Sequence, residues 1–306
     1  MTVLVATEAG LLAVRDDAAP TTELAGRITA LRVDATFGGC AVVDGQALAC
    51  RAEGGSWAIG PVALEAPITA VLATGRGDLV GTADARLARV VDGRAEPLGG
   101  FDRLAGRDQW HAVGSRTPYV RSLSATATGG TLLASVHVGG IPRSADDGAS
   151  WAPTVDIEAD VHEVRAHPVE PAVVMAAAAA GLLESRDEGA RWAPPATTGL
   201  HATYLRALAF PTGAVVVSAS DGPFGPRPAL YRRALEGGPF ERCTDGLPEW
   251  LPAIVDTGAL DARGDQVVAG TAGTVFASED GGATWRVLAD ELPPIRAVAI
   301  ADPPAG

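Results

Sequence analysis

The 306-residue sequence predicts an all-β fold, a seven-bladed β-propeller built from four-stranded antiparallel blades. Three observations support this prediction: a short motif that recurs with fixed spacing, seven strand-like segments at nearly regular intervals, and a composition rich in turn residues. The chain contains 37 glycines and 22 prolines, with 47% hydrophobic and 20% charged residues. Such a chain can bury a large core and supply the tight turns that many short strands need.

The pattern Ser-x-Asp-x-Gly-x-x-Trp occurs three times, and two degenerate copies keep its glycine and its aromatic residue. The three full copies, called the repeat segments below, span residues 144–151, 185–192 and 278–285, and the degenerate copies span 50–57 and 233–240. The aspartate can accept hydrogen bonds from amides in a tight turn, the glycine supplies an unusual backbone angle, and the tryptophan packs between sheets. We therefore expect a structural role, and no catalytic or metal-binding role, for Asp146, Asp187 and Asp280.

This pattern resembles the Asp-box, or BNR, repeat of a superfamily that includes sialidases, xyloglucanases, sortilin-type receptors and a photosystem II assembly factor. The resemblance covers nearly the whole chain and implies a β-propeller. It implies no single activity, because the superfamily contains both enzymes and non-enzymes.

Seven short apolar segments have the character of the opening strand of a blade. They begin at residues 28, 68, 120, 161, 205, 255 and 295. Their spacing of 40 to 52 residues matches that of four-stranded blades. We therefore expect a single domain over residues 1–306, with blades at about 28–61, 68–100, 120–155, 161–197, 204–245 and 254–290, and a last blade that joins 295–300 to 2–25.

The last blade combines the two ends of the chain. Residue 295 is followed by too few residues for a whole blade, so strands at 2–7, 11–15 and 21–24 are expected to complete it. Pairing the C-terminal strand with these strands closes the ring and removes free sheet edges.

Charge and hydropathy exclude several partners. A net charge of -13 argues against nucleic acid, because phosphate binding needs a basic surface. No apolar run reaches the ~20 residues of a membrane span, so we expect no membrane contact. Residues 1–10 form a predicted strand without the features of a signal peptide, which indicates a cytoplasmic protein. We expect no cofactor.

The three cysteines, Cys40, Cys50 and Cys243, have no metal-ligand spacing. Cys40 and Cys50 flank a predicted hairpin turn. A three-residue loop would place them opposite each other, and a two-residue loop would place them on opposite faces. Reduced thiols are expected for a cytoplasmic protein, with a Cys40–Cys50 disulfide as the alternative.

The second residue of each opening strand predicts a ligand site, because equivalent positions form a ring at one mouth of the axial channel. These residues are Thr29, Thr69, Arg121, His162, Arg206, Asp256 and Arg296. Three arginines and a histidine in an acidic protein indicate a site for a carboxylate, sulfate or phosphate, with Asp256 holding one arginine in place. Alternatively, the arginines form ion pairs with blade carboxylates such as Glu163 or Asp160.

Other aromatic and histidine side chains are expected on the same face and complete the predicted ligand-binding set. They are Trp110, Trp250, Tyr119, His111, His137 and His201. Aromatic residues at a rim can stack on a ligand or cap the core. No histidine spacing matches a ligand motif, so no metal site is expected.

Two classes of function follow from this ring. One is a hydrolase or lyase acting on a small anionic, sugar-derived substrate in the axial pocket, with candidate catalytic residues His162, Tyr204, Glu163 and Asp256. The other is a non-catalytic propeller that binds a protein, peptide or glycan on the same face. The polar residues concentrate on the third to sixth blades, which favours a small-molecule pocket. No catalytic residue is transferred from the sialidases, because their Phe/Tyr-Arg-Ile-Pro segment is absent here and those sialidases have six blades.

Overall fold

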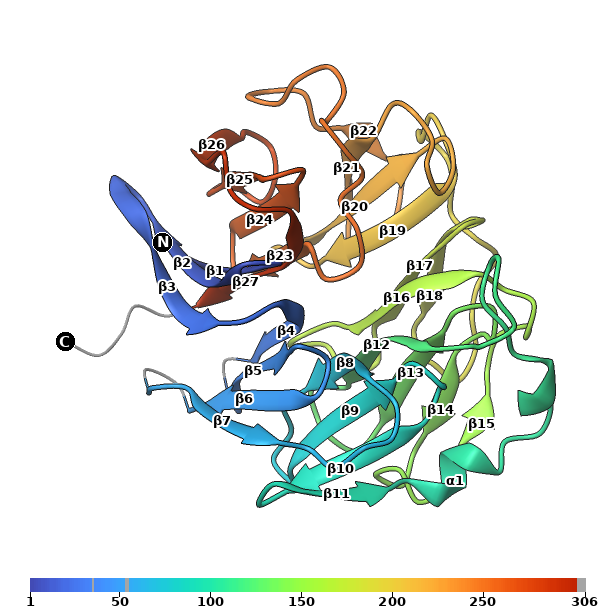
Figure 1. Cartoon of the computed structure of the whole chain (residues 1–306). Coiled ribbons are helices and arrows are strands. Elements are labelled where there is room, and N and C mark those ends of the chain that lie inside the picture. The colour runs from blue at the N-terminus through green and yellow to red at the C-terminus, as the bar shows by residue number, and fades with distance from the viewer. Residues whose placement is uncertain (35, 53–54, 302–306) are drawn as a thin grey trace.

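The computed structural model describes residues 1–34, 36–52 and 55–301, in which seven antiparallel sheets surround a central axis (Figure 1). This arrangement confirms the predicted seven-bladed propeller. Two short helical turns, α1 (Gly99–Asp102) and η1 (Arg107–Gln109), lie in one connection between blades. No helix in the described part of the chain is long and apolar enough to cross a membrane.

In each of the first six blades along the chain, the strands run outward from the axis in sequence order. The first three blades consist of β4 (Ile28–Asp34), β5 (Gly38–Val43), β6 (Ala47–Arg51) and β7 (Ala58–Pro61); β8 (Ile68–Leu72), β9 (Asp78–Thr82), β10 (Leu87–Val91) and β11 (Arg94–Pro97); and β12 (Val120–Ala125), β13 (Leu132–Val136), β14 (Pro142–Ser144) and β15 (Ala152–Pro153). The next three consist of β16 (Val161–Ala166), β17 (Val174–Ala178) and β18 (Gly181–Ser185); β19 (Tyr204–Ala209), β20 (Ala214–Ser220), β21 (Ala229–Ala234) and β22 (Glu241–Arg242); and β23 (Leu260–Arg263), β24 (Gln266–Thr271), β25 (Thr274–Ser278) and β26 (Arg286–Ala289).

The blade that begins with β16 has three regular strands, whereas the other six have four. An isolated bridge between Leu182 and Ala196 takes the place of its fourth strand. The segment after the repeat segment therefore still covers the outer edge of this blade.

The seventh blade closes the ring as predicted. Its strand order is β27 (Ile295–Ala301), β1 (Thr2–Thr7), β2 (Gly10–Arg15) and β3 (Ala18–Ala25). β27 and β1 are antiparallel, with Thr2 opposite Ala301, and lie side by side in Figure 1. Because the two ends of the chain share one sheet, no open blade edge is left between the first and last blades.

The sixth opening strand starts later than predicted. β23 begins at Leu260, five residues after Val255. Val255 is fully buried, which explains its apolar character. However, Gly258 adopts a φ of 77°, a left-handed conformation that cannot continue a strand. Asp256 therefore lies in a turn, unlike the other residues of the predicted ring.

The repeat segments share one hydrogen-bond pattern. In the last of them, Ser278 Oγ accepts a hydrogen bond from the Gly282 amide (2.9 Å) and Asp280 Oδ1 accepts one from the Thr284 amide (2.9 Å). The other two segments repeat both bonds. These bonds agree with the structural role predicted for the three aspartates. The turns follow the third strand of each blade, on the face opposite the starts of the opening strands.

Cys40 and Cys50 lie directly opposite each other on β5 and β6, as a three-residue loop requires. Their sulfur atoms are 3.1 Å apart, and all three cysteines are free thiols. Cys50 also donates a hydrogen bond to Asp78 Oδ2 (3.1 Å).

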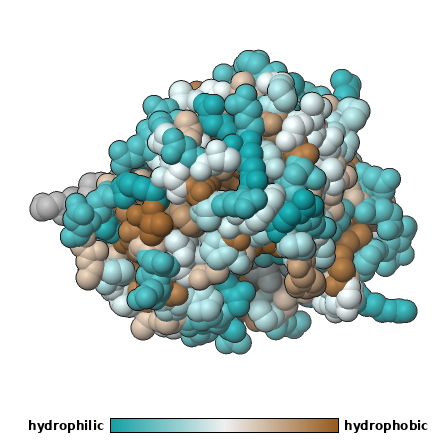
Figure 2. All heavy atoms as spheres, turned by 90° about the horizontal axis from the view of Figure 1, so that it is seen from above, coloured by the Kyte–Doolittle hydropathy of each residue, from teal (hydrophilic) through white to brown (hydrophobic). Residues whose placement is uncertain are grey.

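The face of the molecule seen in Figure 2 is mainly polar. In the view of Figure 2 the apolar side chains form small, separate patches among hydrophilic ones. The larger apolar residues instead fill the spaces between neighbouring blades, as in the cluster of Met175, Leu182, Leu205 and Val217. Burial between blades fixes the positions of the opening strands around the axis.

Candidate functional site at the propeller axis

Six opening strands carry a β-bulge near their start. In β4, Ile28 pairs with Val43 and Ala30 with Val42, which leaves Thr29 as an extra residue. The equivalent shifts fall at Thr69, Arg121, His162 and Arg296, and in β19 the shift spans Arg206 and Ala207. A bulge leaves the extra residue unpaired and redirects its side chain. The predicted ring therefore corresponds to the bulged residues, except at Asp256.

The opening strands enclose an axial cavity of about 490 Å³. The charged residues that line it comprise five arginines and three carboxylates: Arg27, Arg32, Arg121, Arg165 and Arg296, with Glu8, Glu163 and Asp256. The lining thus has an excess of two positive charges in a chain of net charge -13. Such a local excess attracts anions into a cleft.

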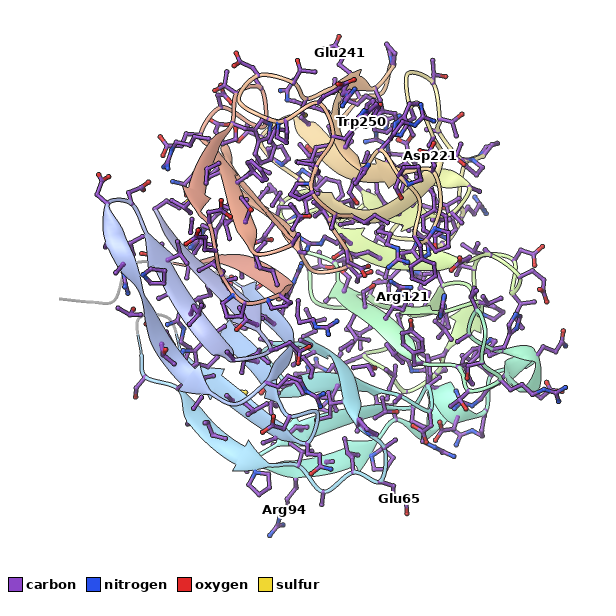
Figure 3. All side chains as sticks on the ribbon, turned by 45° about the horizontal axis from the view of Figure 1, so that its top comes forward. Glu65, Arg94, Arg121, Asp221, Glu241 and Trp250 are labelled. Atoms are coloured by element: carbon purple, nitrogen blue, oxygen red, sulfur yellow. The ribbon has the colours of Figure 1, made fainter. Side chains whose placement is uncertain are left out.

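Arg121 and Arg206 converge on Asp256. Arg121 Nη2 lies 3.2 Å from Asp256 Oδ1 and Arg206 Nη1 lies 2.7 Å from Oδ2, while the Thr257 amide donates to Oδ1 (2.8 Å). Burial alone would raise the pKa of Asp256, but the two arginines outweigh it and hold that pKa below its usual value. Three members of the predicted ring are therefore brought together, and Figure 3 places Arg121 toward the centre of the molecule.

Arg296 lines the same cavity but makes a different contact. Its Nε lies 2.7 Å from Glu8 Oε1, and more than half of its side chain is exposed. It therefore forms an ion pair at the rim, separate from the Arg121–Asp256–Arg206 group.

A second polar layer lies deeper in the channel around Arg165. Its guanidinium donates to Glu163 Oε1 (2.8 Å), Asp261 Oδ1 (3.0 Å) and the Leu260 carbonyl (2.7 Å). The other oxygens of the two carboxylates accept the amides of Leu208 and Ile300 (both 3.0 Å), on neighbouring opening strands. These contacts satisfy amides on strand edges that face the axis. Both oxygens of Glu163, a candidate catalytic residue, are thus engaged in structural bonds.

Arg32 is a member of the site that sequence reasoning missed. It occupies the fifth position of β4, as Arg165 does in β16, and both line the cavity. Among the described residues no carboxylate lies within 4.0 Å of its guanidinium. Repulsion from Arg165, together with burial, lowers the pKa of Arg32 from its usual value. An alignment of the opening strands that included their fifth residues would have paired Arg32 with Arg165.

His162 belongs to a separate cluster with His137 and Asp160. The Nε2 atoms of His162 and His137 lie 3.2 and 3.4 Å from Asp160 Oδ1. Burial, followed by the positive charge of Arg121, lowers the pKa of His137 to about 4. The cluster therefore favours neutral His137, in which one ring nitrogen is an acceptor and the other a donor.

Two tyrosines flank this cluster. The Tyr204 ring centroid lies 4.6 Å from that of His162, and the Tyr119 centroid lies 5.0 Å from that of His137. Burial raises the pKa of Tyr204, so this candidate catalytic residue favours its neutral phenol.

Two of the remaining predicted residues lie around the long inter-blade connection. Trp110 is buried against Phe101 (centroid distance 5.4 Å) beneath the Arg107 guanidinium, so it caps the core. The His111 ring makes one hydrogen bond among the described residues, between its Nδ1 atom and the nearby Gln109 carbonyl.

His201 and Trp250 form an outer group on the β19–β22 blade. His201 Nδ1 lies 2.8 Å from the Tyr231 hydroxyl, and the Trp250 ring is stacked under Arg242. Figure 3 places Trp250 far from Arg121. The structure therefore divides the predicted site residues into an axial group, a histidine cluster and an outer group.

Comparisons with known proteins support the fold. No protein-family model matches the sequence, and neither does any curated protein. Similar solved structures include a GH74 xyloglucanase from Xanthomonas campestris (16% identity, TM-score 0.61), covering 93% of this chain and 46% of the xyloglucanase. The chain thus spans about half of that enzyme's length.

Two other propellers are similar to about the same degree. YCF48 bound to D1 peptide has 16% identity and a TM-score of 0.59 over 94% of this chain and 84% of YCF48. The WD40 propeller domain of Doa1 has 14% identity and a TM-score of 0.61 over 94% of this chain and 86% of that domain. At these identities the similarity establishes the propeller fold alone.

Proposed function

We propose that this propeller binds a small anionic ligand through a carboxylate, sulfate or phosphate group in its axial cavity. One observation carries the proposal: Arg32 faces the cavity beside Arg165 without a carboxylate within ion-pair distance among the described residues. Glu163 and Asp261 already pair with Arg165, so the Arg32 guanidinium is the member of this group that has no ion-pair partner of its own among the described residues. A buried charge without a partner is costly. A bound anion would supply that partner.

The cavity size and its second arginine layer support the same ligand class. A volume of about 490 Å³ is within the range of small-molecule sites. Arg121 lies at the mouth, where Asp256 orients it, so a ligand with one anionic group at Arg32 could meet a second donor there. Sugar acids and sugar phosphates carry such anionic groups, so they are the first compounds to test.

Turnover of this ligand is a further part of the proposal. Tyr204, His162 and Asp256 lie near the mouth and would supply the acid–base groups of a hydrolase or lyase. Glu163 is less suited to this role, because it is buried and both of its oxygens are engaged, whereas about half of the Asp256 side chain is exposed.

The test compares anion binding by the parent chain and an Arg32→Met variant, by calorimetry with phosphate, sulfate and glucuronate. Loss of a desolvated charged contact of about 2 to 4 kcal/mol would weaken binding roughly 30- to 700-fold. Without ligand the variant should melt at a higher temperature than the parent, because the repulsion from Arg165 is removed. Arg191→Ala, on the opposite face, is the matched control and should change neither property.

Equal binding by the parent and Arg32→Met would place the anion elsewhere. A parent chain that binds none of these anions, together with a variant of unchanged melting temperature, would refute the proposal.

A peptide or protein partner at the same mouth is the second candidate function. Phe224 is 97% exposed in the loop between β20 and β21. The same loop accepts a hydrogen bond from Arg206 at the Pro223 carbonyl (3.2 Å), which places it beside the axial group. YCF48, a similar propeller, has been seen with a bound peptide. A Phe224→Ser variant that loses partner binding but keeps anion binding would support this candidate.

A further inference from the structure

The histidine cluster contains facing hydrogen-bond acceptors. His162 is fully buried and its Nδ1 lies 2.5 Å from the Leu205 carbonyl, which can only accept, so Nδ1 carries the hydrogen. In the neutral ring, Nε2 is then an acceptor. It lies 3.2 Å from Asp160 Oδ1, which is also an acceptor, and neither atom has a well-formed hydrogen bond among the described residues. Buried acceptors that face each other cost free energy unless a cation lies between them.

We propose that His137, Asp160 and His162 bind a divalent transition metal, with Zn²⁺ or Fe²⁺ as the ions that best fit two imidazoles and one carboxylate. This ligand set leaves positions open for water or another ligand. The proposal does not depend on anion binding, because neither Arg32 nor Arg165 belongs to this cluster. An ion bound here would take His162 out of the acid–base role proposed above.

The distances between the ligand atoms fit such an ion. Asp160 Oδ1 lies 3.2 and 3.4 Å from the two Nε2 atoms, and the ligand atoms all lie within 4.8 Å of one another. Metal–ligand bonds of about 2.0–2.1 Å place two ligands of a tetrahedral centre roughly 3.3 Å apart. The side chains therefore need little movement to coordinate an ion.

The surroundings also resemble those of a metal site. The bond from His162 Nδ1 to the Leu205 carbonyl fixes the ring and its tautomer, as a backbone carbonyl commonly does for a metal-binding histidine. The ligands come from two adjacent blades: His137 follows β13, whereas Asp160 and His162 lie at the start of β16. Blade packing therefore holds them in place before any ion binds.

Two nearby positive charges oppose the ion, and one negative charge offsets them. Arg121 and Arg206 both act on His137, but each is paired with Asp256. A proton shared between His162 and Asp160 is the competing occupant. One proton would satisfy that pair, and His137 as its Nε2–H tautomer would then donate to the same carboxylate, so the metal titration below decides between the two occupants.

The experiment uses the full chain, stripped of metal with a chelator and then titrated with Co²⁺ and Zn²⁺. Bound Co²⁺ gives visible d–d absorption, and calorimetry gives the stoichiometry for Zn²⁺. We expect one ion per chain and a higher melting temperature with Zn²⁺. His137→Asn and Asp160→Asn should weaken binding about 100-fold or more, since loss of an outer partner alone commonly costs 10–100-fold.

A second group, formed by Cys40, Cys50 and Asp78, supplies the control because it also has metal-ligating atoms within 4.8 Å. A chain with Cys40→Ser and Cys50→Ser should still bind one Co²⁺, without loss of the d–d absorption. Retained binding in His137→Asn and Asp160→Asn, or its loss in the double cysteine variant, would assign the ion to the thiols and overturn the proposal. A parent chain that binds neither ion, with His162 seen as an imidazolium by nitrogen NMR, would show that a proton occupies the site.

Discussion

Glu163 offers the sharpest test of how the axis is held together. It is 3% exposed, receives the Arg165 guanidinium at 2.8 Å and accepts the Leu208 amide at 3.0 Å. Glu163→Ala removes one partner of a buried ion pair, which typically costs about 3–5 kcal/mol. That is a large part of the roughly 5–15 kcal/mol by which proteins are stable. At about 2–4 °C per kcal/mol, the melting temperature should fall by roughly 6–20 °C, measured by circular dichroism.

Two further variants separate the causes of that loss. Glu163→Gln keeps an oxygen for the Leu208 amide but removes the charge beside Arg165, so it should melt between the parent and Glu163→Ala. Glu158→Ala removes an exposed carboxylate from the preceding loop and should melt like the parent. If Glu163→Ala melts within about 2 °C of the parent, the assignment of Glu163 to the support of the axis is wrong.

Three other predictions concern the closure, the turns and the thiols. Deletion of residues 295–306 removes the strand that pairs with β1, and calorimetry should show loss of cooperative unfolding; a truncated chain that melts within a few degrees of the parent would contradict this. Hydrogen bonds from the Thr284 side chain and amide lower the pKa of Asp280 to about 2, so its contribution to stability is present above pH ~4 and is lost as the pH falls toward 2. Asp280→Ala should therefore flatten the decline of melting temperature between pH 4 and 2, and an unchanged profile would exclude this contribution. Mild oxidation should join Cys40 to Cys50, leaving one free thiol of three by thiol titration after unfolding, and three remaining thiols would show that the pair resists oxidation.

The fold could be predicted from the sequence because the turn that recurs from blade to blade is formed by residues that are close together in the chain. A repeat segment forms its turn from bonds within about five residues, such as the Ser278–Gly282 contact, so its sequence pattern depends little on the rest of the chain. The closure followed from counting strands. The start of β23 was predicted five residues too early, because Val255 is buried like a strand residue but does not belong to a sheet.

The site was only partly predictable, because its contacts join distant parts of the chain. The strand alignment grouped Arg121, Arg206 and Asp256, which do meet. It could not show that Arg296 would turn to Glu8, since both lie in the blade where the two ends of the chain combine. The strand alignment offers Asp160 as an ion-pair partner for the arginines, whereas the structure places it between two histidines of neighbouring blades.

At the bulges near the starts of six opening strands, strand pairing and the display of a side chain at the mouth are carried by different residues. Residues on either side of a bulge hold the ladder, whereas the bulged residue is left out of it. The side chain at that position can therefore be exchanged with little effect on strand pairing. The present ring contains threonine, arginine and histidine at such positions, all on backbones of one shape. A substitution at one of these positions therefore changes the chemistry of the mouth without changing the register of the ladder. Thr69 and His162 differ from the rest, because they also donate to carbonyls of the neighbouring blades.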